Sequence, residues 1–169
     1  MVQLESWMNG GSSREQLTRT VYDVSYFNGD GLLQPEQLYQ RNLRNRVSYI
    51  QIFDVQPSGN NYVGTHRAAT YFSYDIHGNV DTLLQDYGNS QYYSNVMNSN
   101  GNRYKKVAYN YDLISGKVNM LIYQPGYYST TLQTWVNQPD RFYHKYLYDG
   151  ENRMTDVYTS HDSLIWERD

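Results

Sequence analysis

From residue 45 to the end of the chain, apolar and polar residues alternate in short runs separated by turn-prone residues. Alternation with a period of two indicates β-strands, and two such runs around a short turn predict an antiparallel hairpin. A strand is expected at 46–54, followed by three hairpins formed by 67–75 with 80–87, 103–112 with 117–123, and 141–149 with 153–159. We therefore predict a mainly β fold of tandem antiparallel hairpins that form a twisted open sheet or a partial spiral shell.

Residues 1–44 carry a weaker pattern, which predicts an irregular segment with one strand and one short helix. The strand is expected within 16–26, where apolar and polar positions alternate. The helix is expected within 35–43, because Pro35 suits the first helical turn and Glu36 suits the positive end of the helix dipole. The hairpin array then occupies 45–169, with units at about 67–87, 103–123 and 141–160.

The dipeptide Tyr-Asp recurs within the array at a constant interval of 37 residues. Each unit has an aromatic residue two positions before the Tyr and a turn-prone residue shortly after the Asp. The motif residues are Phe72, Tyr74, Asp75 and Gly78, then Tyr109, Tyr111, Asp112 and Gly116, then Tyr146, Tyr148, Asp149 and Asn152. A fixed interval of this length indicates one supersecondary unit used repeatedly. A further pair, Tyr22-Asp23, is out of this register, and we give it less weight.

Each motif residue has an expected structural role. The two aromatic residues share one face of their strand and predict ladders of rings between hairpins. The Asp is expected to accept hydrogen bonds from the backbone of its own turn. Gly78 and Gly116 are expected to provide a positive φ, for which Asn152 is the next-best residue. On the return strands, apolar residues such as Val80 and Leu83 are three positions apart, which predicts a β-bulge or a strong twist.

Composition narrows the function classes. The chain of 169 residues has a net charge of −3 and no cysteine, so it predicts neither nucleic-acid binding nor a disulfide framework. Its 20 Tyr suit half-exposed β surfaces, and no apolar run is long enough to insert into a membrane. The four histidines are scattered singly, so we predict no catalytic residue, no metal site and no cofactor. Arg103, Lys105 and Lys106 are expected to form a solvated strand start.

The tandem Tyr-x-Tyr-Asp motifs, each followed by a turn and an apolar residue, resemble the YD-repeat, or RHS-repeat, family. Residues 72–80, 109–118 and 146–154 carry the resemblance, which covers about 67–160. Known relatives include bacterial RHS toxins, shell components of insecticidal Tc toxins, and animal teneurins. The resemblance implies a spiral of β-hairpins that closes into a hollow shell around a C-terminal toxic domain. Two features depart from the family: the connecting loops are longer, and the self-cleaving core segment has no counterpart.

The resemblance implies a structural module of a secreted or cell-surface protein, with no enzymatic activity. Its partners would be the remainder of the same polypeptide, other YD-repeat segments or an enclosed toxin domain. The alternative is a carbohydrate- or protein-binding module on a tyrosine-rich β surface. Its candidate contacts are the aromatic residues of the connections, Tyr92, Tyr93, Tyr127, Tyr128 and Trp135. We also expect a fragment of a longer polypeptide, because the segment 164–169, which starts with the apolar residues Leu164, Ile165 and Trp166, has no partner strand.

Overall fold

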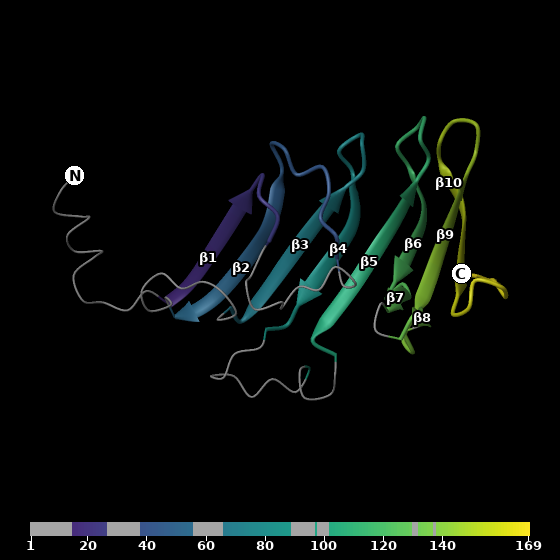
Figure 1. Cartoon of the computed structure of the whole chain (residues 1–169). Helices are drawn as coiled ribbons and strands as arrows, with labels where there is room; N and C mark the ends of the chain where they lie inside the picture. The colour runs from purple at the N-terminus through teal and green to yellow at the C-terminus, as the bar shows by residue number, and fades with distance from the viewer. Residues whose placement is uncertain are drawn as a thin grey trace.

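The computed structural model describes residues 15–26, 38–55, 66–88, 97, 102–129, 132–136 and 138–169. Within this part of the chain, nine strands form one open antiparallel sheet in which neighbours follow sequence order (Figure 1). The strands are β1 (Glu15–Tyr22), β2 (Val47–Val55), β3 (Ala68–Tyr74), β4 (Val80–Asp86), β5 (Tyr104–Tyr111), β6 (Val118–Tyr123), β9 (Phe142–Tyr148), β10 (Met154–Ser160) and β11 (Glu167–Arg168). The predicted mainly β fold of tandem hairpins is confirmed.

A separate two-stranded hairpin lies in the connection between β6 and β9. It consists of β7 (Tyr127–Ser129) and β8 (Thr134–Val136). Among the described residues, no helix is long and apolar enough to cross a membrane.

The turns of the three predicted hairpins, β3–β4, β5–β6 and β9–β10, lie at the same end of the sheet (Figure 1). In each turn, the backbone N–H of the motif Asp donates to the carbonyl of the residue before the return strand, at 2.8–2.9 Å. Gly78, Gly116 and Asn152 have φ of 99°, 70° and 70°. The predicted positive φ at these positions is therefore confirmed.

The second residue of each return strand is an extra residue in the pairing register. Ser73 pairs with Thr82 and Tyr74 pairs with Val80, so that Asp81 is skipped. Asn119 and Thr155 are skipped in the same way in the other two hairpins. These bulges place apolar residues three positions apart on one face of the sheet, as their spacing predicts.

Strands β1 and β2 form a fourth copy of this hairpin. Val21 pairs with Tyr49 and Tyr22 pairs with Val47, so that Ser48 is bulged at the position of Asp81. The low weight that the sequence interval gives to Tyr22-Asp23 is therefore wrong.

An insertion in the turn explains why the interval hides this copy. The backbone N–H of Asp23 donates to Arg46 O at 3.1 Å, as the motif Asp does in the other turns. Asn45, two residues before the return strand, has φ of 58°, where the other turns have Gly78, Gly116 or Asn152. The hairpin therefore closes normally, although the sequence has residues 24–44 inserted between Asp23 and Asn45.

The described part of this insertion lies against the sheet and is not helical, so the predicted helix is wrong over 38–43; residues 35–37 lie outside the described residues. The backbone N–H of Arg41 donates to Ser73 Oγ at 3.2 Å, and Arg41 O accepts from the N–H of Tyr74 at 3.2 Å. These hydrogen bonds to β3 replace the ones that a helix would make within itself.

The described residues 38–44 of the insertion also cover one face of the sheet over β2, β3 and β4. Gln40 fixes them there, because its Nε2 donates to the carbonyls of Ser48 and Phe72 at 2.7 and 3.0 Å. The buried apolar cluster beneath consists of Leu38, Tyr49, Ala69, Tyr71 and Leu84. On the opposite face, two pairs of motif rings are stacked along their strands, with centroids 6.5 Å apart for Phe72 and Tyr74 and 6.2 Å apart for Tyr109 and Tyr111.

Neighbouring hairpins are joined in a single register. The residue three before the motif Tyr pairs with the residue two after the start of the preceding return strand. These pairs are Tyr71 with Tyr49, Ala108 with Thr82, and Lys145 with Met120. The contact between units is therefore repeated as strictly as the units themselves.

At the C-terminal end, β11 pairs with β10 through two residue pairs. The predicted lack of a partner strand is therefore wrong for Glu167 and Arg168. Leu164 and Ile165 are 82% and 71% exposed, whereas Trp166 packs edge-on against Tyr143 with centroids 6.3 Å apart.

Candidate functional site

The second tyrosine of each motif connects its hairpin to the preceding one. The hydroxyl of Tyr74 donates to Val47 O at 2.8 Å, that of Tyr111 to Val80 O at 2.9 Å, and that of Tyr148 to Val118 O at 2.8 Å. Each acceptor is the first residue of the preceding return strand. We call these three contacts the tyrosine joints.

A cation supports two of the tyrosine joints. Arg46 Cζ lies 5.4 Å from the ring centre of Tyr74, and Lys117 Nζ lies 4.6 Å from that of Tyr148. Both cations belong to the residue just before the acceptor strand, so each reaches from one hairpin over the next. A cation over an aromatic face contributes about 0.5–1 kcal/mol at a partly exposed site. In the Tyr111 joint, Asn79 occupies this position, and the hydroxyl still donates to Val80 O. The hydrogen bond of a joint therefore forms without a cation.

The motif aspartates organise the turns. Asp75 Oδ1 accepts from the backbone N–H groups of His77, Gly78 and Asn79 at 2.7–2.9 Å. Asp112 Oδ1 accepts from Ile114 and Ser115 at 3.1 and 2.7 Å, and Asp149 Oδ1 accepts from Arg153 at 2.8 Å. These hydrogen bonds are the turn chemistry expected of a short acidic side chain.

The same hydrogen bonds change the acidity of the aspartates. Burial by itself raises the pKa of Asp75. Hydrogen bonds from the side chain and backbone of Asn79 outweigh this effect and hold the pKa below its ordinary value. Backbone and side-chain bonds from Ser115 lower the pKa of Asp112, and those from Arg153 lower the pKa of Asp149. All three carboxyls are therefore anions that complete a turn.

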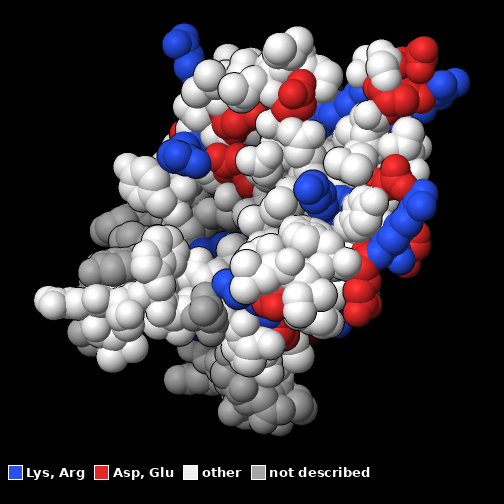
Figure 2. Space-filling model, turned by 90° about the vertical axis from the view of Figure 1, so that its right-hand side faces the viewer, with Lys and Arg blue, Asp and Glu red and all other residues white. Residues whose placement is uncertain are grey.

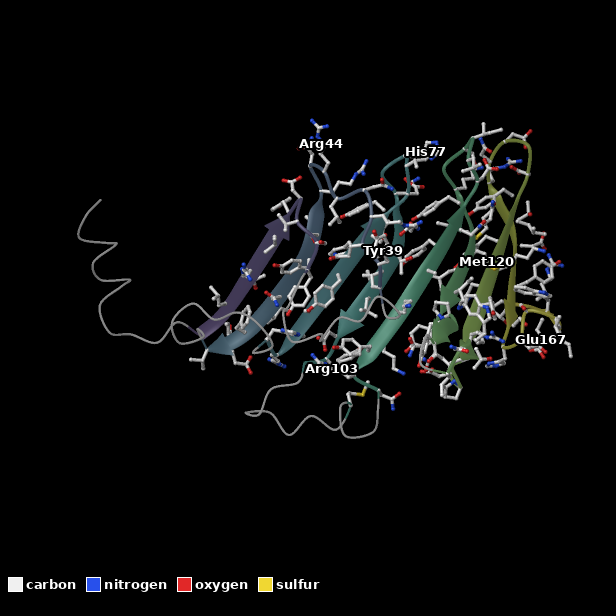
Figure 3. All side chains as sticks on the ribbon, in the orientation of Figure 1. Tyr39, Arg44, His77, Arg103, Met120 and Glu167 are labelled. Carbon is white, nitrogen blue, oxygen red and sulfur yellow. The ribbon has the colours of Figure 1, made fainter. Side chains whose placement is uncertain are left out.

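A buried polar cluster lies at the opposite end of the sheet from the hairpin tips, where Figure 3 labels Arg103. Asp86 accepts from Arg103 Nε at 2.7 Å and Nη2 at 2.9 Å, and its Oδ2 is 2.8 Å from His66 Nε2. Gln51 Nε2 is 3.4 Å from His66 Nδ1. Gln51, His66 and Asp86 are at most 1% exposed and Arg103 is 8% exposed.

The cluster holds two strands and the ends of two connections together. Burial favours the neutral acid, but hydrogen bonds and charge from His66 and Arg103 lower the pKa of Asp86 overall. Both ring nitrogens of His66 already face polar partners, so neither is open to a substrate or a metal. Gln51 lies on β2, Asp86 on β4, and Arg103 just before β5. This geometry suits a structural fastening between hairpins.

Two functional features are not apparent from the sequence. Arg103 is buried and paired with Asp86, the side chain of Lys105 is 11% exposed, and burial lowers the pKa of Lys106. The prediction that these three residues form a solvated strand start is therefore wrong. The second feature is the hairpin that begins with Tyr22-Asp23. Its signal in the sequence is Asn45 followed by Arg46 and the strand from Val47, which corresponds to the turn residue, the cation and the return strand of the other units.

The five aromatic residues predicted as glycan or partner contacts are not all described. Tyr92 and Tyr93 lie outside the described residues, as does the side chain of Tyr128. Trp135 on β8 is 69% exposed, and Tyr127 on β7 is half-buried. Tyr127 pairs with Val136, so it faces the other side of the small hairpin from Trp135. The structure therefore does not bring Tyr127 and Trp135 onto one surface.

Among the described residues, no group of three His, Cys, Asp or Glu side chains is placed to hold a metal ion. Comparison with known proteins finds no matching family model, no matching curated protein and no matching solved structure.

Proposed function

We propose that this chain is a structural β-hairpin repeat module of the RHS or YD type, without catalysis of its own. In this proposal it forms part of the wall of a secreted or cell-surface shell that encloses or presents a toxin-like domain. The observation that supports it is the set of tyrosine joints. Tyr74, Tyr111 and Tyr148 belong to the most regular motif of the sequence. Their hydroxyls bind the hairpin that carries them to the preceding hairpin.

The arrangement suits a wall in two respects. The motif aspartates bind their own turns, and the motif tyrosines of the joints bind the neighbouring hairpin. Each joint uses a backbone carbonyl as its acceptor, so it does not depend on the side chain at that position. Because the register between hairpins is constant, such a sheet can be extended by adding units of the same kind. The toxin-like content and the location outside the cell come from the family resemblance.

The experiment is to isolate the native polypeptide with an antibody against this chain, sequence it by mass spectrometry and image it by cryo-electron microscopy. We expect further Tyr-Asp hairpins continuous with this sheet and a hollow particle. A polypeptide without such hairpins, or a particle that encloses no volume, would contradict the proposal.

The second candidate function is recognition of a glycan or a protein, and the exposure of Trp135 favours it. Exposed indole rings can stack on the apolar faces of sugars. A glycan array probed with the chain and with Trp135→Ala separates the two functions. Binding that is lost in Trp135→Ala would support recognition, whereas no binding by either protein is expected of a wall module.

A further inference from the structure

The last described hairpin, β9–β10, has the acceptor position of a tyrosine joint, but no described tyrosine donates to it. Met154 is the first residue of β10 and has the position of the acceptors Val47, Val80 and Val118. Its register with β9 includes the same bulge, so its carbonyl has the same direction, away from β9. Among the described residues, no tyrosine hydroxyl donates to Met154 O.

The neighbouring residue completes the resemblance to a joint. Arg153 precedes Met154 as Arg46 precedes Val47, and its side chain is 74% exposed while paired with Asp149 at 2.7 Å. The C-terminal edge therefore presents both the acceptor and the cation that the other joints use. Figure 2 views the molecule from this side and shows acidic and basic side chains interspersed on it.

The opposite end of the sheet has a motif tyrosine without a joint. Tyr22 ends β1, the first strand of the sheet, and is 54% exposed. Within the described chain, no carbonyl accepts from its hydroxyl and no strand pairs with the outer edge of β1. One end of the sheet thus has a donor without an acceptor, and the other has an acceptor without a donor.

The constant register between hairpins specifies how these ends would meet. A β1 strand placed beside β10, with Tyr22 at Met154, would pair Arg19 with Asp156 and Thr18 with Val157. Arg19 and Asp156 carry opposite charges, which favours this cross-strand pair. Within the chain, Arg168 of β11 already forms an ion pair with Asp156. Asp156 therefore already pairs with an arginine at this edge, and Arg19, whose Nη1 donates to Gln51 Oε1 at 3.3 Å, would take the place of Arg168.

We propose that the outer edge of β10 binds β1 of a second copy of this chain, head to tail, with Tyr22 of the second copy donating to Met154 O. The incoming strand displaces β11, which makes two residue pairs with β10, at Tyr158 and Thr159, and one further backbone hydrogen bond, from the N–H of Asp169 to Val157 O at 3.0 Å. The incoming strand would extend over Asp156 to Ser160. This inference concerns an edge and its partner, and it does not require a shell.

The chain has no cysteine, so single cysteines can test the register directly. One preparation carries Thr18→Cys and a second carries Val157→Cys; the two are mixed under mild oxidation. The matched control replaces Thr18→Cys by Thr20→Cys, on the same strand face but two residues out of register. We expect the mixed disulfide to form about tenfold faster than in the control, because a diagonal pair is too far apart to be bridged.

Sedimentation of the unmodified chain over a range of concentrations provides the second measurement. Tyr22→Phe removes only the hydroxyl and should raise the dissociation constant about tenfold, as expected for one lost hydrogen bond. A monomer at every concentration would overturn the inference, as would equal disulfide rates or a dominant Thr18→Cys homodimer. A hollow native particle together with any of these results would leave the proposed function standing.

Discussion

The hydroxyl of Tyr111 donates to the carbonyl of Val80 at 2.9 Å, across the boundary between two hairpins. Because Val80 begins its strand just after one turn and Tyr111 ends its strand just before the next, this bond joins the turn ends of two neighbouring hairpins. The same relationship recurs at Tyr74 and Tyr148. A motif that reads as a local turn signal is therefore also the contact that builds the sheet.

Valine at the turn glycines should destabilise the fold, and Gly78 should be the more sensitive. A β-branched residue at positive φ costs on the order of 1–3 kcal/mol. A Cβ at Gly78 would also lie 2.6 Å from Arg46 Nη2, so the flexible end of this side chain would have to move from its place over the Tyr74 ring, whereas nothing lies within 4 Å of one at Gly116. The free energy of unfolding measured in urea should be lower for Gly78→Val than for Gly116→Val, and that of Gly116→Asn should be close to wild type. A Gly116→Val protein as stable as wild type would remove this account of the turn.

The fourth hairpin predicts an effect at a position far from the regular series. Asn45→Val should lower the free energy of unfolding by about 1–3 kcal/mol, because Asn45 has a positive φ that a β-branched residue disfavours. Asn45→Gly is the control and should be nearly neutral. The matched variant Asn152→Val should show a similar loss by thermal unfolding. An unchanged Asn45→Val protein would mean that β1–β2 is not a copy of the unit.

Removing the carboxylate of Asp86 should be among the most damaging single changes. Asp86→Asn leaves the buried guanidinium of Arg103 without its counter-charge, and breaking a buried ion pair costs about 3–5 kcal/mol. The control is Asp140→Asn, which removes a partly exposed ion pair with Lys105 and should cost about 0–1 kcal/mol. Urea midpoints compare the two variants. Equal losses would argue against the buried cluster as a fastening.

Stability should fall in acid. The folded-state pKa of Asp75, Asp86, Asp112 and Asp149 is lowered, so the unfolded chain binds more protons as the pH drops below about 3.9. The stabilisation they provide is complete above that pH and is lost as the pH falls through their folded-state values. Urea midpoints from neutral pH to about pH 2 should show this decline, and Asp86→Asn should make it shallower. A midpoint that does not change in acid would contradict it.

The features that follow from local chemistry can be read from the sequence. The hairpins, the positive φ at Gly78 and the bulge at Asp81 depend on residues within one unit. The features that fail depend on distant contacts. The segment at 38–43 forms its hydrogen bonds with β3 and so is not helical, and Arg103 is buried because Asp86 lies on the adjacent strand. A constant interval also cannot show a copy whose turn holds an insertion.

The residue two positions before each joint tyrosine provides an internal control for the claim that the tyrosine hydroxyls hold the hairpins together. The tyrosine of the joint is present in all four hairpins, at Tyr22, Tyr74, Tyr111 and Tyr148, whereas two positions earlier the residue varies. Phe72 occupies the position of Tyr109, and within the described chain the hydroxyl of Tyr109 has no hydrogen-bond partner. A hydroxyl is therefore expected to matter at the joint and not at the earlier position.

The most direct test is the free energy of unfolding of Tyr111→Phe, Tyr148→Phe and Tyr109→Phe, measured by urea denaturation under one set of conditions. The two joint variants should each lose about 0.5–1.5 kcal/mol, the net value of one hydrogen bond, while Tyr109→Phe stays close to wild type. Equal losses at all three positions, or no loss at Tyr111 and Tyr148, would show that the tyrosine hydroxyls do not hold the hairpins together.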